Sequence, residues 1–315
     1  MKVRQILNKY GIVFILLTLV IIFSLGNSTF FSISNFINII RQITILSIIT
    51  IGMSFVLISG GIDLSVGAQL AFIGVLTATI FTNTQVPPLL ACVIGVVVAT
   101  IVGIVNGLFI SFTKVPPIIA TLAMQQILTG FAYLISSGKP IYGLEESVQL
   151  IGQGYVGIIP IPVIIMVICI IIGIFILNKT YVGRSFYVLG NNEEVGRLSG
   201  IRTKKSKTIA YGLCGMLSGV AAIIMMSRIN SGSPVVGKGF EMDVLTAAVL
   251  GGVSITGGEG KLSGAIIGAL IIGVLSNGLI IMNIGEYYQM VIKGLVLAFA
   301  VAFDSIKNKK IQASA

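Results

Sequence analysis

Histidine is absent from this chain of 315 residues, and only three cysteines are present. Without histidine, the chain cannot build a Ser-His or Cys-His catalytic pair or a histidine-ligated metal site from its own residues. Cys92, Cys169 and Cys214 lie in apolar runs, and their spacing fits neither a metal site nor a disulfide framework. We therefore expect packing roles for the cysteines, no metal or cofactor in this chain, and no catalysis that depends on histidine.

Charged residues are also scarce, at 10% of the chain, whereas apolar residues make up 56% and the mean hydropathy is +1.06. Because a soluble globular domain carries about 25% charged residues, this composition predicts an integral membrane protein. Strand-type alternation is missing, so we expect an all-α polytopic helical bundle and not a barrel. The formal charge of +10 fits basic cytoplasmic loops better than a nucleic-acid site.

The apolar runs are near the length of about 20 residues that a membrane helix needs. They predict about ten spans, near residues 11–26, 42–60, 66–82, 88–111, 117–137, 158–177, 206–227, 243–256, 262–282 and 287–304. The first run follows basic residues but has no good cleavage site after it, so we interpret it as an uncleaved span. An even count places both basic termini and the basic loop 178–205 in the cytoplasm, with residues 1–315 forming one transmembrane domain.

Glycine pairs interrupt two of these runs. The second span ends in Gly-Gly-Ile-Asp-Leu-Ser-Val-Gly at 60–67, and the eighth passes through Gly-Gly-Val-Ser-Ile-Thr-Gly-Gly at 251–258. Corresponding glycine-broken segments in two halves of a chain indicate a transport pathway. Re-entrant turns and tight packing are the alternative, and for Asp63 we favour a helix cap over solute contact. The predicted pathway residues are Gly60, Gly61, Asp63, Ser65, Asn106, Gly251, Gly252, Ser254, Thr256 and Asn277.

A short polar helix is predicted between the sixth and seventh spans. The asparagines at 191–192 can cap its start, and Glu193 and Glu194 suit its first turn. Arg197 can pair with both acids, and Gly200 can end the helix in a left-handed conformation. Because so short a helix is marginal in water, we expect it to lean on a partner protein beneath the membrane.

No energy source is encoded here. The nearest match to a phosphate-binding loop is Gly-Gly-Glu-Gly-Lys at 257–261, but Leu262 follows where serine or threonine is required. Acidic residues within the spans are too few for a proton relay, and for Lys293 in the last span we favour snorkelling to the interface. The chain therefore does not itself bind ATP through such a loop.

Several motifs together resemble ABC importer permeases of the ribose/monosaccharide class. The run Thr-Tyr-Val-Gly-Arg at 180–184, followed by Gly-x-Asn-Glu-Glu-x-x-Arg-Leu-Ser-Gly-Ile at 190–201, resembles the cytoplasmic loop of these permeases. Residues 60–67, 237–264, 277–279 and 287–294 continue the resemblance over nearly the whole chain. One departure is Val195-Gly196, where the family commonly has two alanines.

The resemblance implies the permease subunit of an ATP-driven monosaccharide importer in the inner cell membrane, with ribose as the leading candidate. It implies a homodimeric pore, ATP-binding subunits, an extracytoplasmic sugar-binding protein, surrounding lipid and no nucleic acid. The implied contacts with the ATPase are Gly190, Asn192, Glu193, Glu194, Arg197, Ser199, Gly200 and Ile201. On the outer face, we expect charges that can dock the binding protein or simply be solvated: Arg41, Arg228, Lys238, Glu241 and Asp243.

Two other function classes stay open from the sequence. An ion-coupled secondary carrier of a small polar solute would transport when present alone and would respond to an ion gradient. An intramembrane enzyme would need a nucleophile or metal constellation, and none based on histidine is possible in this chain.

Overall fold

The computed structural model describes the backbone of residues 2–312 and the side-chain environments of 12–302, 304 and 305. The described chain is an all-α bundle, as predicted, with one two-residue hairpin, β1 (Tyr155–Val156) and β2 (Ile159–Pro160). The helices are α1 (Lys2–Gly26), the 3-10 turn η1 (Ser28–Phe31), α2 (Ile33–Ile58), α3 (Val66–Asn83), α4 (Pro88–Thr113), α5 (Pro117–Ser136), α6 (Glu146–Gln153), α7 (Ile161–Lys179), α8 (Tyr181–Asn191), α9 (Glu193–Leu198), α10 (Thr203–Ile229), α11 (Phe240–Leu250), α12 (Leu262–Ile281) and α13 (Glu286–Gln312).

Seven of the described helices are long and apolar enough to cross a membrane: α2, α3, α4, α5, α7, α10 and α12. The apolar part of α1, Ile12–Gly26, is shorter. Helix α2 begins nine residues before the predicted span, because Ser32 caps it by accepting a hydrogen bond from the Asn35 backbone N–H at 3.2 Å. These helices establish a polytopic bundle whose spans largely match the apolar runs.

The eighth predicted span is not a crossing helix. Helix α11 has only 11 residues and rises about 16 Å, about half of the hydrocarbon thickness of roughly 30 Å. Neither glycine break lies inside a long helix: the first separates α2 from α3, and the second separates α11 from α12. Gly60 and Gly252 adopt φ values of 80° and 82°, a left-handed conformation that ends a helix.

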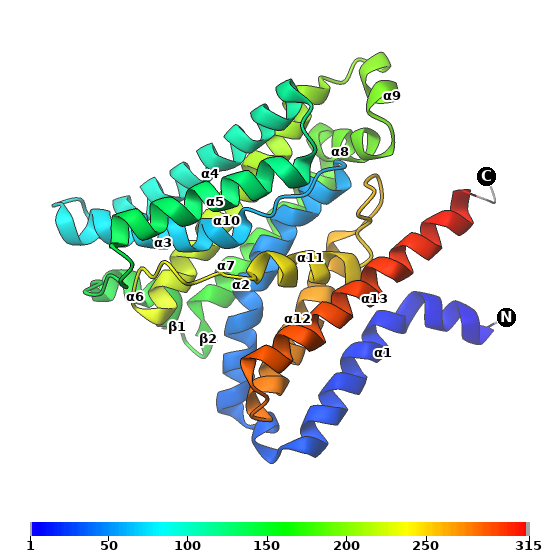
Figure 1. Ribbon diagram of the computed structural model, residues 1–315. Helices are drawn as coiled ribbons and strands as arrows, with labels where there is room; N and C mark the ends of the chain where they lie inside the picture. The colour runs from blue at the N-terminus through cyan, green and yellow to red at the C-terminus, as the bar shows by residue number, and fades with distance from the viewer. Residues whose placement is uncertain (1, 313–315) are drawn as a thin grey trace.

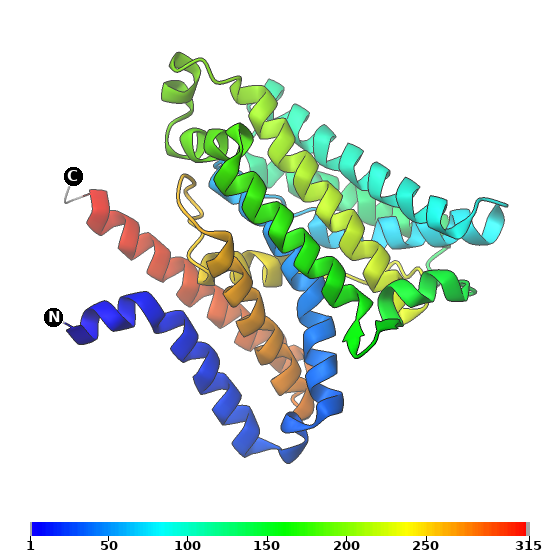
Figure 2. The same cartoon turned by 180° about the vertical axis from the view of Figure 1, so that it is seen from behind.

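Two layers of helices share α2 between them. Helices α3, α4, α5, α7 and α10 lie on one side of α2, and α1, α12 and α13 lie on the other (Figures 1 and 2). The described N-terminal end of α1 and C-terminal end of α13 point toward the end of the bundle that carries α8 and α9. A separate apolar cluster, including Phe23, Ile43 and Leu275, joins α1, α2 and α12.

Glycine allows α4 and α10 to approach closely. A Cβ added at Gly103 would lie 2.2 Å from the carbonyl oxygen of Tyr211, and one at Gly215 would lie 2.3 Å from that of Ala99. Such distances are too short for any side chain, so small residues at these positions are required for the observed packing. The loop after α2 packs against this pair of helices.

Candidate functional site at the α8–α9 end of the bundle

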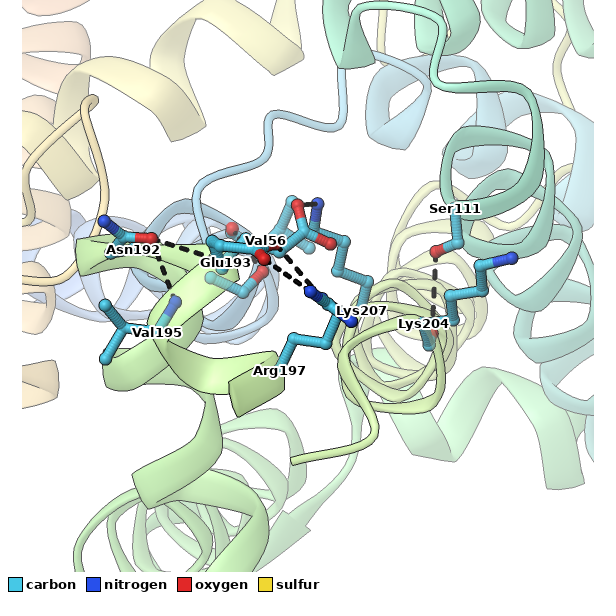
Figure 3. Close-up of polar contacts among 10 residues, drawn as sticks. Val56, Ser111, Asn192, Glu193, Val195, Arg197, Lys204 and Lys207 are labelled. Atoms are coloured by element: carbon cyan, nitrogen blue, oxygen red, sulfur yellow. Dashed lines mark hydrogen bonds and ion pairs between the residues drawn. The ribbon is translucent and has the colours of Figure 1, made fainter. Parts of the chain in front are cut away.

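Helix α9 has the cap and the end that the sequence predicts. The Asn192 side-chain oxygen accepts hydrogen bonds from the backbone N–H groups of Glu194, at 2.9 Å, and Val195, at 3.1 Å (Figure 3). Gly200 follows the helix with φ 80°, a left-handed conformation that suits glycine. The local sequence therefore determines both ends of this six-residue helix.

The charges of α9 pair differently from the prediction. Arg197 donates hydrogen bonds from Nε and Nη2 to the Glu194 carboxylate, whereas Glu193 pairs with Lys207 of α10 (Figure 3). Arg197 thus does not bridge both acids, because the ammonium of Lys207 reaches Glu193 from the neighbouring helix. Through hydrogen bonding and charge, the Arg197 guanidinium lowers the pKa of the Glu194 carboxyl, and Glu194 raises the pKa of Arg197.

An apolar strip on α9 is left uncovered by the described chain. Val195 is 52% exposed and Leu198 is 74% exposed, although both are apolar. Gly196 instead faces α8, where an added Cβ would lie 3.4 Å from Cγ1 of Val188. Ile201, one of the implied contacts with the ATPase, is half-buried just before α10. The helix therefore presents two large apolar side chains, a paired Glu194–Arg197 and little else.

Both glycine breaks contact the last turn of α8, just before α9 in the chain. A Cβ added at Gly190 would lie 2.0 Å from the Ile58 carbonyl oxygen and 2.2 Å from the Gly258 backbone nitrogen. Gly258 N–H donates to that same Ile58 oxygen at 3.0 Å. A Cβ at Gly257 would lie 2.9 Å from Cα of Gly60. We call this three-way contact of residues 58–60, Gly190 and residues 257–258 the glycine junction.

Two side chains of α8 fasten the second break to the glycine junction. The Tyr187 hydroxyl donates to the Gly260 carbonyl at 2.8 Å, and the Asn191 amide donates to the Gly258 carbonyl at 3.3 Å. Sequence reasoning did not identify either residue as functional. The doubled glycines at 257–258 and the Gly190-Asn191 pair were the available signal, because glycine is favoured where two backbones touch.

The first break contains a closed polar cluster. Asp63 Oδ1 accepts hydrogen bonds from the Ser65 backbone N–H at 3.0 Å and the Ser65 hydroxyl at 2.6 Å. The Ser65 hydroxyl oxygen accepts from the amides of Asn106 and Gln69, each at 3.1 Å. All four side chains are at most 2% exposed. The structure thus brings together three predicted pathway residues, and the bonds of Asp63 are those of a turn before α3.

The second break is built differently. Gly251 packs against α12, where an added Cβ would lie 2.4 Å from Cα of Ala265. Ser254 and Thr256 share a hydroxyl hydrogen bond of 2.9 Å, and Ser254 donates to the Asp304 carboxylate of α13 at 3.4 Å. Asn277 lies apart, donating to Asn35 at 2.9 Å between α12 and α2. The predicted pathway residues therefore occupy three separate places and do not form one cluster.

Among the predicted docking charges, two lie together at the end of the bundle opposite α9. Arg41 donates to the Gln153 carbonyl at 3.0 Å and lies 4.9 Å from the ring centre of Tyr155. Gln153 in turn donates to the Arg228 carbonyl at 3.2 Å. Lys238 is exposed in the turn before α11.

The two predicted docking acids are engaged inside the protein. Glu241 is 6% exposed and accepts a hydrogen bond from the Gln125 amide at 3.0 Å. Asp243 forms an ion pair of 2.6 Å with Lys293. Lys293 therefore does not simply snorkel, as we favoured from the sequence, because a carboxylate on α11 faces it from α13. Neither acid presents a free charge at the surface.

Comparison with known proteins gives consistent relatives. The family described as branched-chain amino acid transport system / permease component matches residues 35–301. The chain is 41% identical over 305 residues to the ribose import permease protein RbsC of Bacillus subtilis, covering 96% of this chain and 94% of the relative. Identity to RbsC of Escherichia coli K12 is 40%, covering 93% and 92%, and identity to the L-arabinose transport system permease protein AraH of the same strain is 37%, covering 97% and 93%. No solved structure matches the chain significantly.

Proposed function

Because the chain belongs to the permease-component family of branched-chain amino acid transport systems, we propose that it forms the membrane pathway of an ATP-driven importer of a monosaccharide, ribose or a related sugar. It is a permease component and not an enzyme. The names of its relatives, which concern ribose and L-arabinose, support a sugar as the solute. Family membership also sets aside the ion-coupled carrier and the intramembrane enzyme.

ATP and Mg²⁺ bind to a separate or fused ATPase in this proposal, and the ATPase docks on α9. The glycine junction is the observation that supports a coupling role for α9. Because Gly190 touches both broken segments and α9 begins three residues later, displacement of α9 is passed directly to the end of α2 and to the loop after α11. The exposed Val195 and Leu198 form an apolar contact surface for the ATPase. The residues at the edge of this surface are Asn192, Glu193, Glu194, Arg197, Ser199 and Gly200.

A chain of ten passes in one domain, with both termini in the cytoplasm, fits the path of the backbone. The eighth pass combines residues 231–239 with α11. It starts where Gly232 lies against α3, with an added Cβ 2.7 Å from the Gly74 carbonyl oxygen. It ends where Gly258 bonds to Ile58 at the α8–α9 end. Non-helical backbone at membrane depth is stable only when protein or water covers it, and residues 231–234 are buried.

The pore is a homodimer in this proposal, and an extracytoplasmic sugar-binding protein delivers the solute at the end opposite α9. Arg41 and Arg228 support that docking site, because the two positive side chains lie near one another and each is half-buried at this end of the bundle. Acidic groups on the binding protein would complement them. Glu241 and Asp243 contribute by holding α11 to α5 and α13.

The experiment is reconstitution in vesicles with the ATPase and the ribose-binding protein of the same importer. Leu198→Asp places a charge in the apolar strip without touching the core, so ribose uptake and ATPase retention on purification should each fall at least tenfold. The matched control for ATPase retention is Ile158→Asp, in the hairpin at the other end, where the side chain is 92% exposed. Full uptake by Leu198→Asp, or ribose accumulation by the chain without any ATPase, would overturn the proposal.

A further inference from the structure

An apolar groove runs along the outside of the α4–α10 pair toward the α9 end. It has a volume of about 610 Å³. One wall is a stripe of α4 with a spacing of four residues, from Thr100 to Phe112, and the other is the facing side of α10, from Lys204 to Met216. Phe112 is 65% exposed and Leu108 is 42% exposed. Much of this stripe is therefore open to the surroundings of the helix pair.

Gly212 forms the floor of the groove. A Cβ added there would lie 3.1 Å from Cγ1 of Ile104, so the two helices are in contact at the base of the groove. From residue 100 to residue 112 a helix rises about 18 Å. One leaflet of a bilayer has a hydrocarbon depth of about 15 Å. The groove therefore matches the length of a single lipid leaflet.

Two lysines mark one end of the groove. The Lys204 ammonium lies 4.2 Å from the ring centre of Phe112, and Lys205 lines the same mouth. Lys207 turns toward Glu193, whereas Lys204 turns toward α4, beside Ser111 (Figure 3). Neither Lys204 nor Lys205 forms an ion pair with any residue whose side chain is described. Two uncompensated cations thus sit where an apolar groove reaches the interface.

We propose that this groove binds an anionic phospholipid, with an acyl chain between α4 and α10 and the phosphate headgroup on Lys204 and Lys205. Charge complementarity at the mouth and the leaflet-length apolar walls select this occupant over a neutral lipid. A peptide would leave backbone groups unsatisfied against these walls. The site is distinct from the glycine junction, because none of the residues of that junction lines the groove.

The chain contains no tryptophan, so Phe112→Trp places a single fluorophore in the groove. The full chain is assembled in phosphatidylcholine nanodiscs that contain a minor fraction of either brominated phosphatidylglycerol or brominated phosphatidylcholine. Bromine quenches tryptophan only at close range. We expect a preference of about threefold to tenfold for phosphatidylglycerol in the Phe112→Trp protein, based on the attraction of juxtamembrane lysines to anionic lipid.

Two controls make the result specific. Adding Lys204→Gln and Lys205→Gln should abolish the preference, whereas adding Lys179→Gln and Lys261→Gln, at the same end of the bundle, should preserve it. A lone tryptophan at Phe175, 60% exposed on α7, should report a weaker preference. Equal quenching by the two lipids, a preference that survives loss of Lys204 and Lys205, or no quenching by either lipid because a second copy covers the groove would each overturn the proposal.

Discussion

The two glycine-broken segments resemble one another in sequence, but the fold uses them in different ways. Residues 60–67 close around a buried cluster in which the Ser65 hydroxyl donates to Asp63 and accepts from Asn106. Residues 251–258 form a loop whose hydrogen bonds go to α8 and α13. A glycine pair therefore marks where the backbone leaves a helix. The packing of neighbouring helices determines whether the turn that follows forms a buried cluster or a connection.

The difference matters because the segments meet at Gly190. The first arrives as the rigid end of α2, and the second arrives as a loop fastened to α8 by Tyr187 and Asn191. Movement of α8 and α9 therefore acts on the second segment through side-chain hydrogen bonds. It acts on the end of α2 through backbone contact at Gly190 and through the packing of Phe186 against Phe55.

The largest effect is expected for Gly190→Ala, which breaks the meeting point itself. The added Cβ would lie 2.0 Å from the Ile58 carbonyl oxygen, and both neighbours are backbone that cannot rotate away. Overpacking of this kind typically costs about 1–3 kcal/mol. We expect a lower thermal unfolding temperature in detergent and at least tenfold less ribose uptake in vesicles with the partner ATPase.

Gly130→Ala is the matched control for that variant. Gly130 lies within α5, and an added Cβ there would meet nothing within 4 Å. Because alanine favours a helix by about 1 kcal/mol over glycine, this variant should be as stable as the parent or more so. Equal behaviour of the two variants would show that the glycine junction does not need its close contact.

The next largest effect is a difference in lost stability between variants of the two segments. Asp63→Ala removes the acceptor for the Ser65 N–H and hydroxyl inside a fully buried cluster, and an unsatisfied buried group costs about 1–3 kcal/mol. Ser254→Ala removes a hydroxyl contact with Thr256 and two long bonds, one from the Thr256 N–H at 3.3 Å and one to Asp304 at 3.4 Å, so we expect a smaller loss of about 1 kcal/mol. Thermal unfolding of both variants measures the gap, and equal losses would contradict the distinction.

Removing the hydrogen bonds from α8 to the second segment should change stability less. It should selectively weaken the coupling between ATP hydrolysis and sugar uptake. Tyr187→Phe with Asn191→Ala removes both bonds from α8 to residues 258–260, each worth about 1 kcal/mol. We expect ATP hydrolysis to continue while the number of sugars taken up per ATP falls several-fold. Tyr142→Phe, at a 67% exposed position, is the control and should leave that ratio unchanged. If the number of sugars taken up per ATP is unaltered in the double variant, these two hydrogen bonds are not needed to transmit movement from α8 to the second segment.

The sequence predicted much of this fold because a membrane span is a one-dimensional signal. Apolar runs located the long helices, and the cap at Asn192 and the end at Gly200 followed from local backbone chemistry. The length of α11 could not be predicted, because its apolar residues continue into the break at Gly251. An apolar run alone does not distinguish a helix from extended backbone that other helices bury.

The partners of charged residues were the least predictable part of the site. Lys207 lies fourteen positions from Glu193, and Asp243 lies fifty positions from Lys293, so neither pairing has a helical spacing that sequence can reveal. The meeting of both breaks at Gly190 was hidden for the same reason. The pairs that sequence did anticipate, such as Glu194 with Arg197, are three residues apart on one helix.

The smallest effect on stability is expected at that exposed pair. Both side chains are 63% exposed, and exposed ion pairs contribute little. Because Arg197 lowers the folded-state pKa of Glu194, any stabilisation is present at neutral pH and is lost only as the pH falls through that lowered value. Arg197→Gln should therefore unfold at the same temperature as the parent at pH 7. If ribose uptake nevertheless falls, and the charge exchange Glu194→Arg with Arg197→Glu does not restore it, the pair acts on the ATPase and not on α9. Restored uptake would instead assign it to holding the short helix together.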